Sequence, residues 1–286
     1  MWENFKVRCS AINKIMSTSR SNATLTEKQR ERLLELYSKM SPTANQIKEL
    51  GELQEKEKNG TRVILSDTCI EYLMEAYAYE VYKKQSITKE LDIQYTQKGK
   101  LVEEESIMLL SLLDSTLYVK NDERIENDYL SGEPDIHDGD TILSAKKIID
   151  VKSVWDYPGF LRKIHQKPDS GYDYQLKGYM DLTGAQEAEI AYCLVNTPEV
   201  MVNDFKRKLM YKMNVATDEN PEYLLQCAKL EHSMYFDDIE VHKRVFKVPV
   251  QPFTDEQRQA VYDRVKVCRE WLENFHEEYQ KLNKNG

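Results

Sequence analysis

The chain has 286 residues, of which 41% are hydrophobic and 31% are charged, and its formal net charge at pH 7 is −9. This length suffices for one large domain or two small domains with a substantial core. No run of about 18 apolar residues occurs, and the N-terminal segment lacks the continuous apolar block of a secretory signal, so we expect no membrane span and a cytoplasmic protein. The net negative charge alone argues against a nucleic-acid partner, but a metal-dependent nuclease also carries acidic residues whose charge the metal offsets.

Cysteine usage argues against several kinds of site. The five cysteines are scattered and none forms a CxxC pair, which disfavours a disulfide framework, a zinc knuckle and an iron–sulfur cluster. The same pattern fits a reducing cytoplasm. The cysteines are Cys9, Cys69, Cys193, Cys227 and Cys268.

The first 85 residues or so are predicted to be helical. Thr26 and Gln29 have capping-box spacing, and an apolar stripe with helical period follows them. The dipeptide Ser41-Pro42 predicts the start of another, short helix. The charged stretch 55–60 predicts a solvated loop or hinge, and Ser66 can cap the next helix.

The middle of the chain alternates between helix and strand signals. The predicted order is a helix entered through Gly99, two strands joined across His137–Asp140, a helix that stops near Gly184, and a strand. Alternation of this kind builds a mixed sheet flanked by helices. The elements cover residues 98–113, 129–136, 146–155, 172–184 and 188–196.

Two helices, a strand and a long amphipathic helix are predicted beyond Thr197-Pro198. Asn220-Pro221 caps the second helix, residues 244–250 form the strand, and Thr254 and Gln257 open the last helix as a capping box. We therefore divide the chain into a helical region (1–94) within the same globule, a core (95–197), and C-terminal helices with one strand that pack on that core (198–286).

Acidic and basic residues in the middle of the chain form a candidate catalytic set. Asp150 and Lys152 lie two apart in a β-rich run, so they share one face of a strand, and Asp135 follows Pro134 near the end of the preceding strand. Magnesium prefers one or two carboxylates together with waters and phosphate oxygens, and a lysine on the same face would neutralise developing negative charge or position the attacking water. The alternatives are that Asp135 is a turn residue and that Asp150 and Lys152 form a structural ion pair. A second DxK triplet, Asp204–Lys206, lies in a predicted helix and is interpreted as a solvated face.

A third acidic residue is expected from the helix that precedes these strands. Glu103 shares a helix face with Ile107 and Leu110, which points it inward, whereas Glu104 and Glu105 are expected to face solvent.

The order of these motifs resembles the PD-(D/E)XK nuclease superfamily, most closely phage lambda exonuclease and the YqaJ-type viral recombinase nucleases. The matching stretches are "GKLVEEES" with Gly99 and Glu103, "GEPDI" with Asp135, "DVK" with Asp150 and Lys152, and "YQLKGYM" with Gln175 and Tyr179 at QxxxY spacing. They cover roughly residues 95–197. Asp150 stands where lambda-type enzymes usually have glutamate, and the helical stretch before Gly99 has no assigned counterpart.

The resemblance implies a role for each residue of the set. Glu103, Asp135 and Asp150 would hold one or two Mg²⁺ ions, which Mn²⁺ can replace, and the Val151 carbonyl is a further candidate ligand. Lys152 would assist the attacking water.

Other residues would support the site or contact DNA. Gln175 and Tyr179 would brace it, and Arg8 and Ser10 in "FKVRCSAINKIM" are similar to a segment that contacts the DNA end phosphate. In the stretch 160–167, predicted to be a loop, Arg162 and Lys163 are candidate phosphate contacts from their charge, with a solvated loop as the alternative. Trp155 and Tyr157 either stack on a base or pack in the core.

These features predict an α/β restriction-endonuclease-like core with helical N-terminal and C-terminal elaborations. The predicted function is a magnesium-dependent exonuclease on linear double-stranded DNA, phage- or prophage-encoded, in phage-type recombination. The alternatives are an endonuclease of restriction or repair type and a DNA-binding recombination factor with little cleavage. A homotrimer and a single-strand-annealing partner protein are what the resemblance suggests.

Overall fold

The computed structural model divides the chain into two compact units. The boundaries of these units differ from the predicted stretches 1–94, 95–197 and 198–286. The period of an amphipathic helix shows that the helix has an apolar face, but it does not show which distant segment covers that face. The larger unit comprises residues 6–12 and 85–258, and the smaller comprises 1–5, 13–84 and 259–286. The structure describes residues 2–17, 25, 27–39, 41–61, 65–86 and 94–284.

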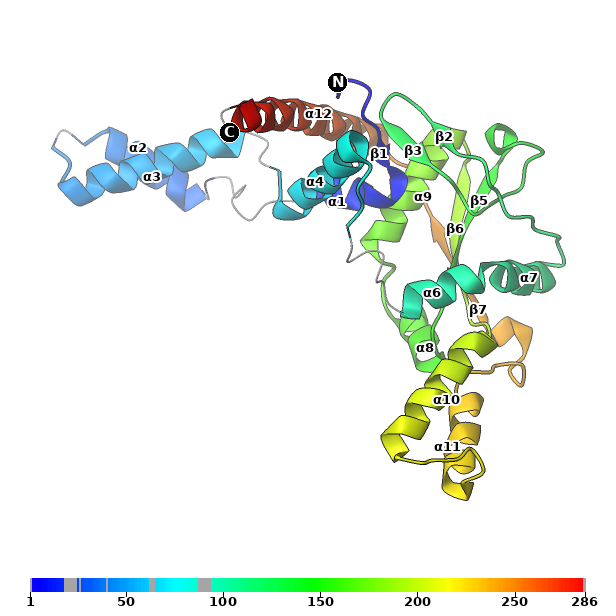
Figure 1. The fold of residues 1–286 in the computed structure, drawn as a ribbon. Coiled ribbons are helices and arrows are strands. Elements are labelled where there is room, and N and C mark those ends of the chain that lie inside the picture. Colours follow the sequence, from blue (N-terminus) through cyan, green and yellow to red (C-terminus); the bar gives the residue numbers. More distant parts are fainter. Residues whose placement is uncertain are drawn as a thin grey trace. The chain divides into compact units, whose positions relative to one another are not determined.

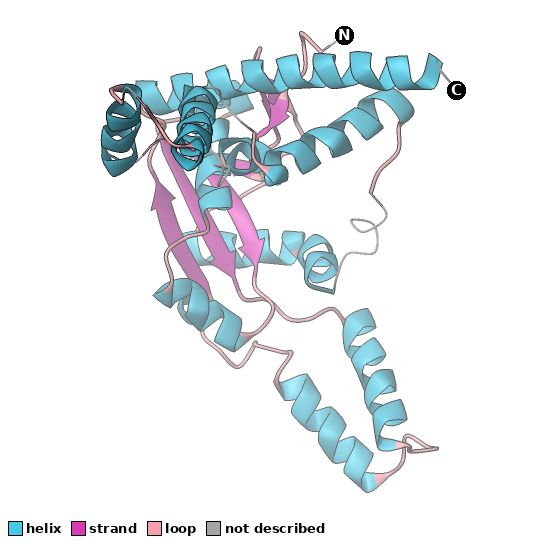
Figure 2. Cartoon of the chain, turned by 90° about the vertical axis from the view of Figure 1, so that its left-hand side faces the viewer, coloured by secondary structure: helices cyan, strands magenta, loops and turns pink. Residues whose placement is uncertain are grey.

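The larger unit is built on a mixed sheet, as the alternating pattern predicts (Figure 2). β5 and β6 run parallel, whereas β4 and β7 pair antiparallel with their neighbours. A parallel connection requires a crossover of a dozen or more residues, which α8 and α9 supply here. In order across the sheet the strands are β4 (Ile136–His137), β5 (Lys147–Ser153), β6 (Glu187–Cys193) and β7 (Val245–Val250).

Helices cover both faces of this sheet (Figure 1). Ile149 and Val151 of β5 belong to an apolar cluster with Leu110 of α7. Asp150, between them, points to the opposite face, where its side chain meets Gln175 of α9. The described helices of this unit are α6 (Gln94–Leu101), α7 (Glu103–Asp114), α8 (Tyr157–His165), α9 (Ser170–Thr183), α10 (Glu199–Met213) and α11 (Pro221–His232).

A small second sheet contains part of a segment that the sequence predicts as a single strand. The predicted strand 129–136 is divided into β3 and β4, which belong to different sheets, and residues 133–135 form the bend between them. Pro134 explains the break, because it lacks an N–H for the ladder. In order, the small sheet consists of β1 (Val7–Arg8), β3 (Leu130–Gly132) and β2 (Ile125–Glu126), with β1 parallel to β3.

Two further predictions for local structure in this unit were wrong. The predicted helix 98–113 is two helices, α6 and α7, that break at Val102. The predicted loop 160–167 lies mostly in α8, because Asp156 caps that helix by accepting the Gly159 N–H at 2.6 Å and Pro158 occupies its first turn. The predicted helix end at Gly184 is confirmed, with φ at 79°.

In the smaller unit, α3 begins later and runs longer than the sequence predicts. It continues through the stretch 55–60, predicted to be a loop, because glutamate, glutamine and lysine suit an exposed helix as well as a solvated loop. The cap at Ser66 and the capping box of Thr254 and Gln257 are confirmed, while Thr26 lies outside the described residues.

Most residues of the following helices lie in the smaller unit: α1 (Ile12–Met16), α2 (Glu27–Tyr37), α3 (Ala44–Thr61), α4 (Asp67–Tyr82) and α12 (Asp255–Lys284). None of the described helices is both long and apolar enough to cross a membrane.

Candidate active site

Asp135 lies in the bend between β3 and β4, and main-chain contacts hold it there. Its carbonyl oxygen accepts the Asn121 N–H at 2.8 Å, and the Asn121 side chain donates to the carbonyl of Pro134 at 2.9 Å. The Asp135 carboxylate accepts the main-chain N–H of Val151 at 2.7 Å. The bend therefore places this carboxylate against β5, at the residue that follows Asp150.

Asp150 and Lys152 share the face of β5 that α9 covers, as the period of a strand predicts. Asp150 is fully buried, and the Lys152 ammonium lies 2.6 Å from its Oδ2. The same ammonium lies 5.0 Å from the ring centroid of Tyr172, a residue of α9 that no sequence pattern singles out. The structure thus brings two carboxylates and one lysine together on one side of the sheet.

The electrostatic state of these groups follows from their burial and mutual proximity. Burial, followed by the charge of Asp150, raises the pKa of Asp135 to about 7. Burial also raises the pKa of Asp150, although Lys152 acts in the opposite direction. Burial lowers the pKa of Lys152, but the carboxylates of Asp150 and Asp135 outweigh it and hold this pKa above its ordinary value. The positive charge of Lys152 therefore does not fully offset the cost of ionising the two buried acids, while the lysine itself stays protonated.

Helix α9 supplies a brace for the acidic pair. Gln175 Nε2 donates to Asp150 Oδ1 at 3.1 Å and to the Tyr179 hydroxyl at 2.8 Å. Gln175 and Tyr179, four residues apart, lie on the same helix face. The QxxxY spacing thus corresponds to a hydrogen-bonded chain that ends on Asp150.

Two glycines let the elements around this brace approach closely. A Cβ at Gly132 would lie 2.7 Å from the Tyr179 ring, and a Cβ at Gly178 would lie 2.8 Å from Cys9 Sγ. Only glycine allows these contacts without displacement of a neighbour. Neither position was predicted from the sequence, because a close approach between distant segments leaves no local pattern.

Glu103 is placed as predicted relative to its neighbours, but it has a partner of its own. It is half-buried in the first turn of α7, whereas Glu104 and Glu105 are exposed. Its charge contributes to the raised pKa of both Asp135 and Asp150. Its Oε2 lies 3.0 Å from Lys120 Nζ. In the part of the chain that the structure describes, no group of three His, Cys, Asp or Glu side chains lies at metal-ligand spacing.

The Val151 carbonyl lies at the same edge of β5 as the Asp135 carboxylate. The Val151 N–H points to that edge, and the N–H and C=O of one strand residue point to the same neighbour. β4 pairs with Ile148 and Ile149 only, so it ends before Val151. This carbonyl is therefore placed where a ligand shared with Asp135 would lie.

Arg162 and Lys163 line a pocket of about 360 Å³ together with Lys152, which we call the cationic pocket. Lys163 Nζ lies 5.5 Å from the ring centroid of Tyr192, whose hydroxyl is buried without a hydrogen-bond partner among the described residues. The full lining is Lys152, Ser153, Val154, Trp155, Asp156, Gly159, Arg162, Lys163, Gln166, Tyr172 and Tyr192. The two predicted phosphate contacts thus lie beside the candidate catalytic lysine.

Arg8 and Ser10 are exposed and flank Cys9, which lies against α9 at Gly178. They belong to β1 and to the 3-10 turn of residues 9–11, next to β3. Their contact with a DNA end stays a prediction.

A buried lysine near the site was not predicted from the sequence. Lys98 has 1% of its surface exposed, and its ammonium donates to the carbonyls of Val154 and Trp155 at 3.2 and 3.0 Å. Burial lowers its pKa to about 8. Lys98 precedes the buried Val102 by four residues, which is the spacing of residues on one helix face. This spacing is the one sequence signal that Lys98 is buried.

Comparison with solved structures identifies the fold. A phage-related exonuclease from Haemophilus somnus 129PT matches with a TM-score of 0.59 and 22% identity, over 96% of this chain and 97% of that chain. An alkaline exonuclease from Laribacter hongkongensis matches with a TM-score of 0.55 and 12% identity, over 99% and 97%. The fold is that of the phage-type exonucleases.

The same exonuclease fold is matched by a second structure of the Laribacter enzyme, in complex with dAMP. Its TM-score is 0.50 and its identity 13%, over 96% of this chain and 97% of that chain. No protein-family profile and no curated protein matches the chain. The predicted restriction-endonuclease-like class and the resemblance to lambda-type exonucleases are thus confirmed at the level of the fold.

Proposed function

We propose that this chain is a divalent-metal-dependent deoxyribonuclease that degrades linear double-stranded DNA from an end, in phage-type recombination. The observation that carries the proposal is the convergence of Asp135, Asp150 and Lys152 on one side of the sheet, with Gln175 hydrogen-bonded to Asp150. The fold shared with two exonucleases supports this class of reaction.

The donor set at this position fits a hard cation such as Mg²⁺ or Mn²⁺. Asp135 and Asp150 supply carboxylate oxygens and Val151 a carbonyl, and magnesium sites commonly use one or two carboxylates, with waters and phosphate oxygens for the remainder. Asp150 Oδ2 is buried beside the Lys152 ammonium, yet it accepts no hydrogen bond of regular geometry from the described residues. The pKa of both acids is raised, which a bound cation would reverse. Glu103, whose Oε2 lies 3.0 Å from Lys120 Nζ, is the further carboxylate proposed for this set.

The residues of the candidate site each have a physical role in this proposal. When bound, the cation supplies Lewis-acid polarisation of the phosphate and charge neutralisation. Lys152, whose ammonium lies 2.6 Å from Asp150 Oδ2, places a positive charge beside the reacting phosphate and the attacking water. The hydrogen bond from Gln175 fixes the orientation of Asp150, and the Val151 N–H fixes that of Asp135.

The cationic pocket supports DNA as the proposed substrate. Two of its cations, Arg162 and Lys163, lie beside the third, the catalytic Lys152, where they would bind phosphates of one DNA strand despite the net negative charge of the chain. Arg8 and Ser10 are proposed to contact the end phosphate. A trimer and a single-strand-annealing partner remain proposals that follow from the same resemblance.

The test uses end-labelled linear duplex and covalently closed circular DNA, each incubated with Mg²⁺ or with EDTA. We expect degradation of the linear duplex only, lost in EDTA and in Lys152→Ala. Lys206→Ala is the matched control, because Lys206 occupies the other DxK triplet, on α10, and pairs with Glu231. Cleavage of the circle would instead indicate an endonuclease, and an absence of Lys152-dependent cleavage would favour a DNA-binding factor.

A further inference from the structure

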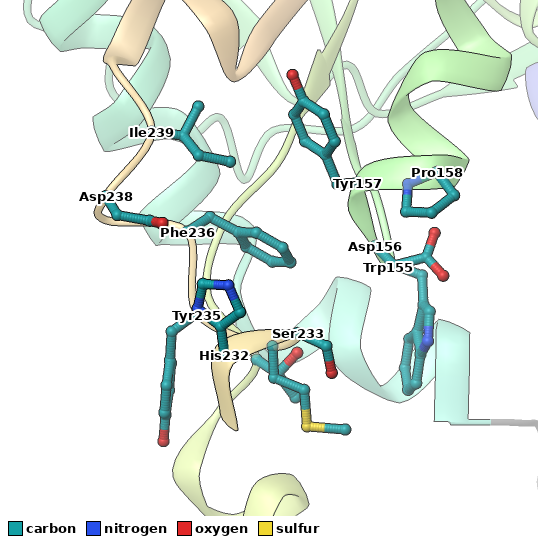
Figure 3. A pocket seen from close by; sticks show the side chains of 12 residues that line it. Trp155, Asp156, Tyr157, Pro158, His232, Ser233, Tyr235, Phe236, Asp238 and Ile239 are labelled. Carbon is teal, nitrogen blue, oxygen red and sulfur yellow. The ribbon is translucent and has the colours of Figure 1, made fainter. Parts of the chain in front are cut away.

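A second cavity opens on the other side of the chain segment that follows β5. It has a volume of about 440 Å³, within the range of small-molecule sites. Residues 155–158 form one wall, and the segment after α11 forms the other, with Phe236 and Ser233 facing Trp155 across the opening (Figure 3). The full lining is Trp155, Asp156, Tyr157, Pro158, Thr197, His232, Ser233, Met234, Tyr235, Phe236, Asp238 and Ile239.

Four aromatic side chains, those of Trp155, Tyr157, Tyr235 and Phe236, line this cavity, and a buried charge lies against two of them. Lys98 Nζ lies 5.8 Å from the ring centroid of Trp155 and 5.4 Å from that of Phe236. The same ammonium binds the main chain at Val154 and Trp155. The Trp155 ring also meets the Phe205 ring edge-on, with centroids 6.1 Å apart. The ring pair is therefore built into the unit before any ligand binds.

The charges that line the cavity disfavour a phosphate as its occupant. Its charged carboxylates are those of Asp156 and Asp238, and no lysine or arginine lines it. A carboxylate accepts hydrogen bonds from the exocyclic amino group of a base. Stacking on aromatic rings also suits a base, because every base has a π-face.

The cavity adjoins the cationic pocket, with which it shares Trp155 and Asp156. A nucleotide strand has phosphates and bases at alternating positions. A cationic pocket beside an aromatic cavity matches that alternation, with the shared segment 155–156 between the two.

We propose that the cavity between residues 155–158 and 232–239 is a nucleobase pocket that accepts one unstacked base of the DNA strand whose phosphates occupy the cationic pocket. This inference rests on the proposed function for its substrate. It assigns to half-buried Trp155 the stacking of that base, to Phe236, which is 3% exposed, a place in the wall beside it, and to Asp238 an acceptor at the exposed rim.

The test measures DNA affinity in EDTA, so that cleavage does not contribute. Short 5′-phosphorylated duplexes carry a single abasic site at successive positions from the end, and their dissociation constants are compared with that of the intact duplex. We expect one position at which the abasic site weakens binding by between about 5-fold and about 150-fold, the value of one stacked base.

Two variants act on the cavity by different means. Trp155→Leu removes the stacking ring, and Ser233→Trp fills the cavity from an exposed residue at the end of α11 while both rings stay in the chain. Both should weaken binding of the intact duplex and abolish the penalty of the abasic site. Tyr211→Leu is the control, because Tyr211 is an aromatic residue of α10 that is 84% exposed and does not line the cavity.

The outcomes separate this inference from the proposed function. An equal affinity for all abasic duplexes, or an unchanged penalty in folded Ser233→Trp, would overturn the nucleobase pocket even if the wild type degrades DNA. A position-specific penalty that both variants abolish would establish the pocket even if no DNA is cleaved.

Discussion

The main-chain N–H of Val151 donates to the Asp135 carboxylate at 2.7 Å, which ties the turn after β3 to the strand that carries Asp150. This hydrogen bond places the two acids beside each other, although 15 positions separate them in the chain (150 − 135). Burial, followed by the charge of Asp150, raises the pKa of Asp135, and burial raises the pKa of Asp150, so keeping both carboxylates ionised here carries a free-energy cost.

Replacement of Asp135 by asparagine should separate stability from activity. Asparagine keeps an oxygen for the Val151 N–H but removes one of two repelling buried charges, so we expect the metal-free protein at pH 8 to gain about 0.5–2 kcal/mol in free energy of unfolding. Cleavage and the stabilisation by added Mg²⁺ should both be lost. Thermal unfolding with and without Mg²⁺ measures this, with exposed Asp140→Asn as the control. A Mg²⁺-dependent shift that persists in Asp135→Asn would contradict the assignment.

The adjacent glutamates of α7 provide a matched pair. Glu103→Gln should lower kcat/KM by about 10- to 100-fold, because its charge acts on both buried acids, whereas exposed Glu104→Gln should change it by less than about 2-fold. Single-turnover degradation of a labelled duplex checks both values. The reverse order of effects would show that the other face of α7 points to the site.

Lys98 should make stability depend on pH in a defined direction. Its pKa falls from 10.5 to about 8 on burial. Below pH 8 the ammonium is charged in both states, and its desolvation cost is fully present. Between pH 8 and 10.5 the unfolded chain holds this proton and the folded chain releases it, so the stability contributed by Lys98 rises with pH.

The difference in unfolding free energy between wild type and Lys98→Met isolates this effect. It should shift in favour of the wild type by on the order of 2 kcal/mol between about pH 8 and pH 10. Chemical denaturation across that range measures the difference. Lys100→Met, at an exposed position of the same helix, should show no such trend, and an equally flat profile for Lys98→Met would contradict the lowered pKa.

Two glycines should respond to alanine in opposite directions. Gly132→Ala places a Cβ 2.7 Å from the Tyr179 ring and should cost about 1–3 kcal/mol of stability, with reduced cleavage because Tyr179 is displaced from Gln175. Gly99 lies inside α6, where a Cβ would have no neighbouring atom within 4 Å, so Gly99→Ala should stabilise the protein by about 0.5–1 kcal/mol. Urea unfolding of the two variants distinguishes them, and destabilisation by Gly99→Ala would show that this position needs glycine.

Local signals in the sequence predicted most of the elements and the heart of the candidate site. Capping at Ser66 and Thr254 and the helix end at Gly184 depend on a few neighbouring residues, and each is found in the structure. The shared face of Asp150 and Lys152 and that of Gln175 and Tyr179 follow from the periods of a strand and a helix. These relationships are set by residues close together in the chain, so the sequence by itself determined them.

The tertiary structure alone decided which distant segments meet. It divided the predicted strand 129–136 between two sheets, anchored the Asp135 turn on Asn121, and placed Lys98 under Trp155 and Phe236. The spacing of Lys98 from Val102 indicates at most a shared helix face, and nothing local names its partners, because they are main-chain atoms and rings from elsewhere in the chain. Such contacts depend on the packing of whole elements against one another. The same packing forms the cavity between residues 155–158 and 232–239.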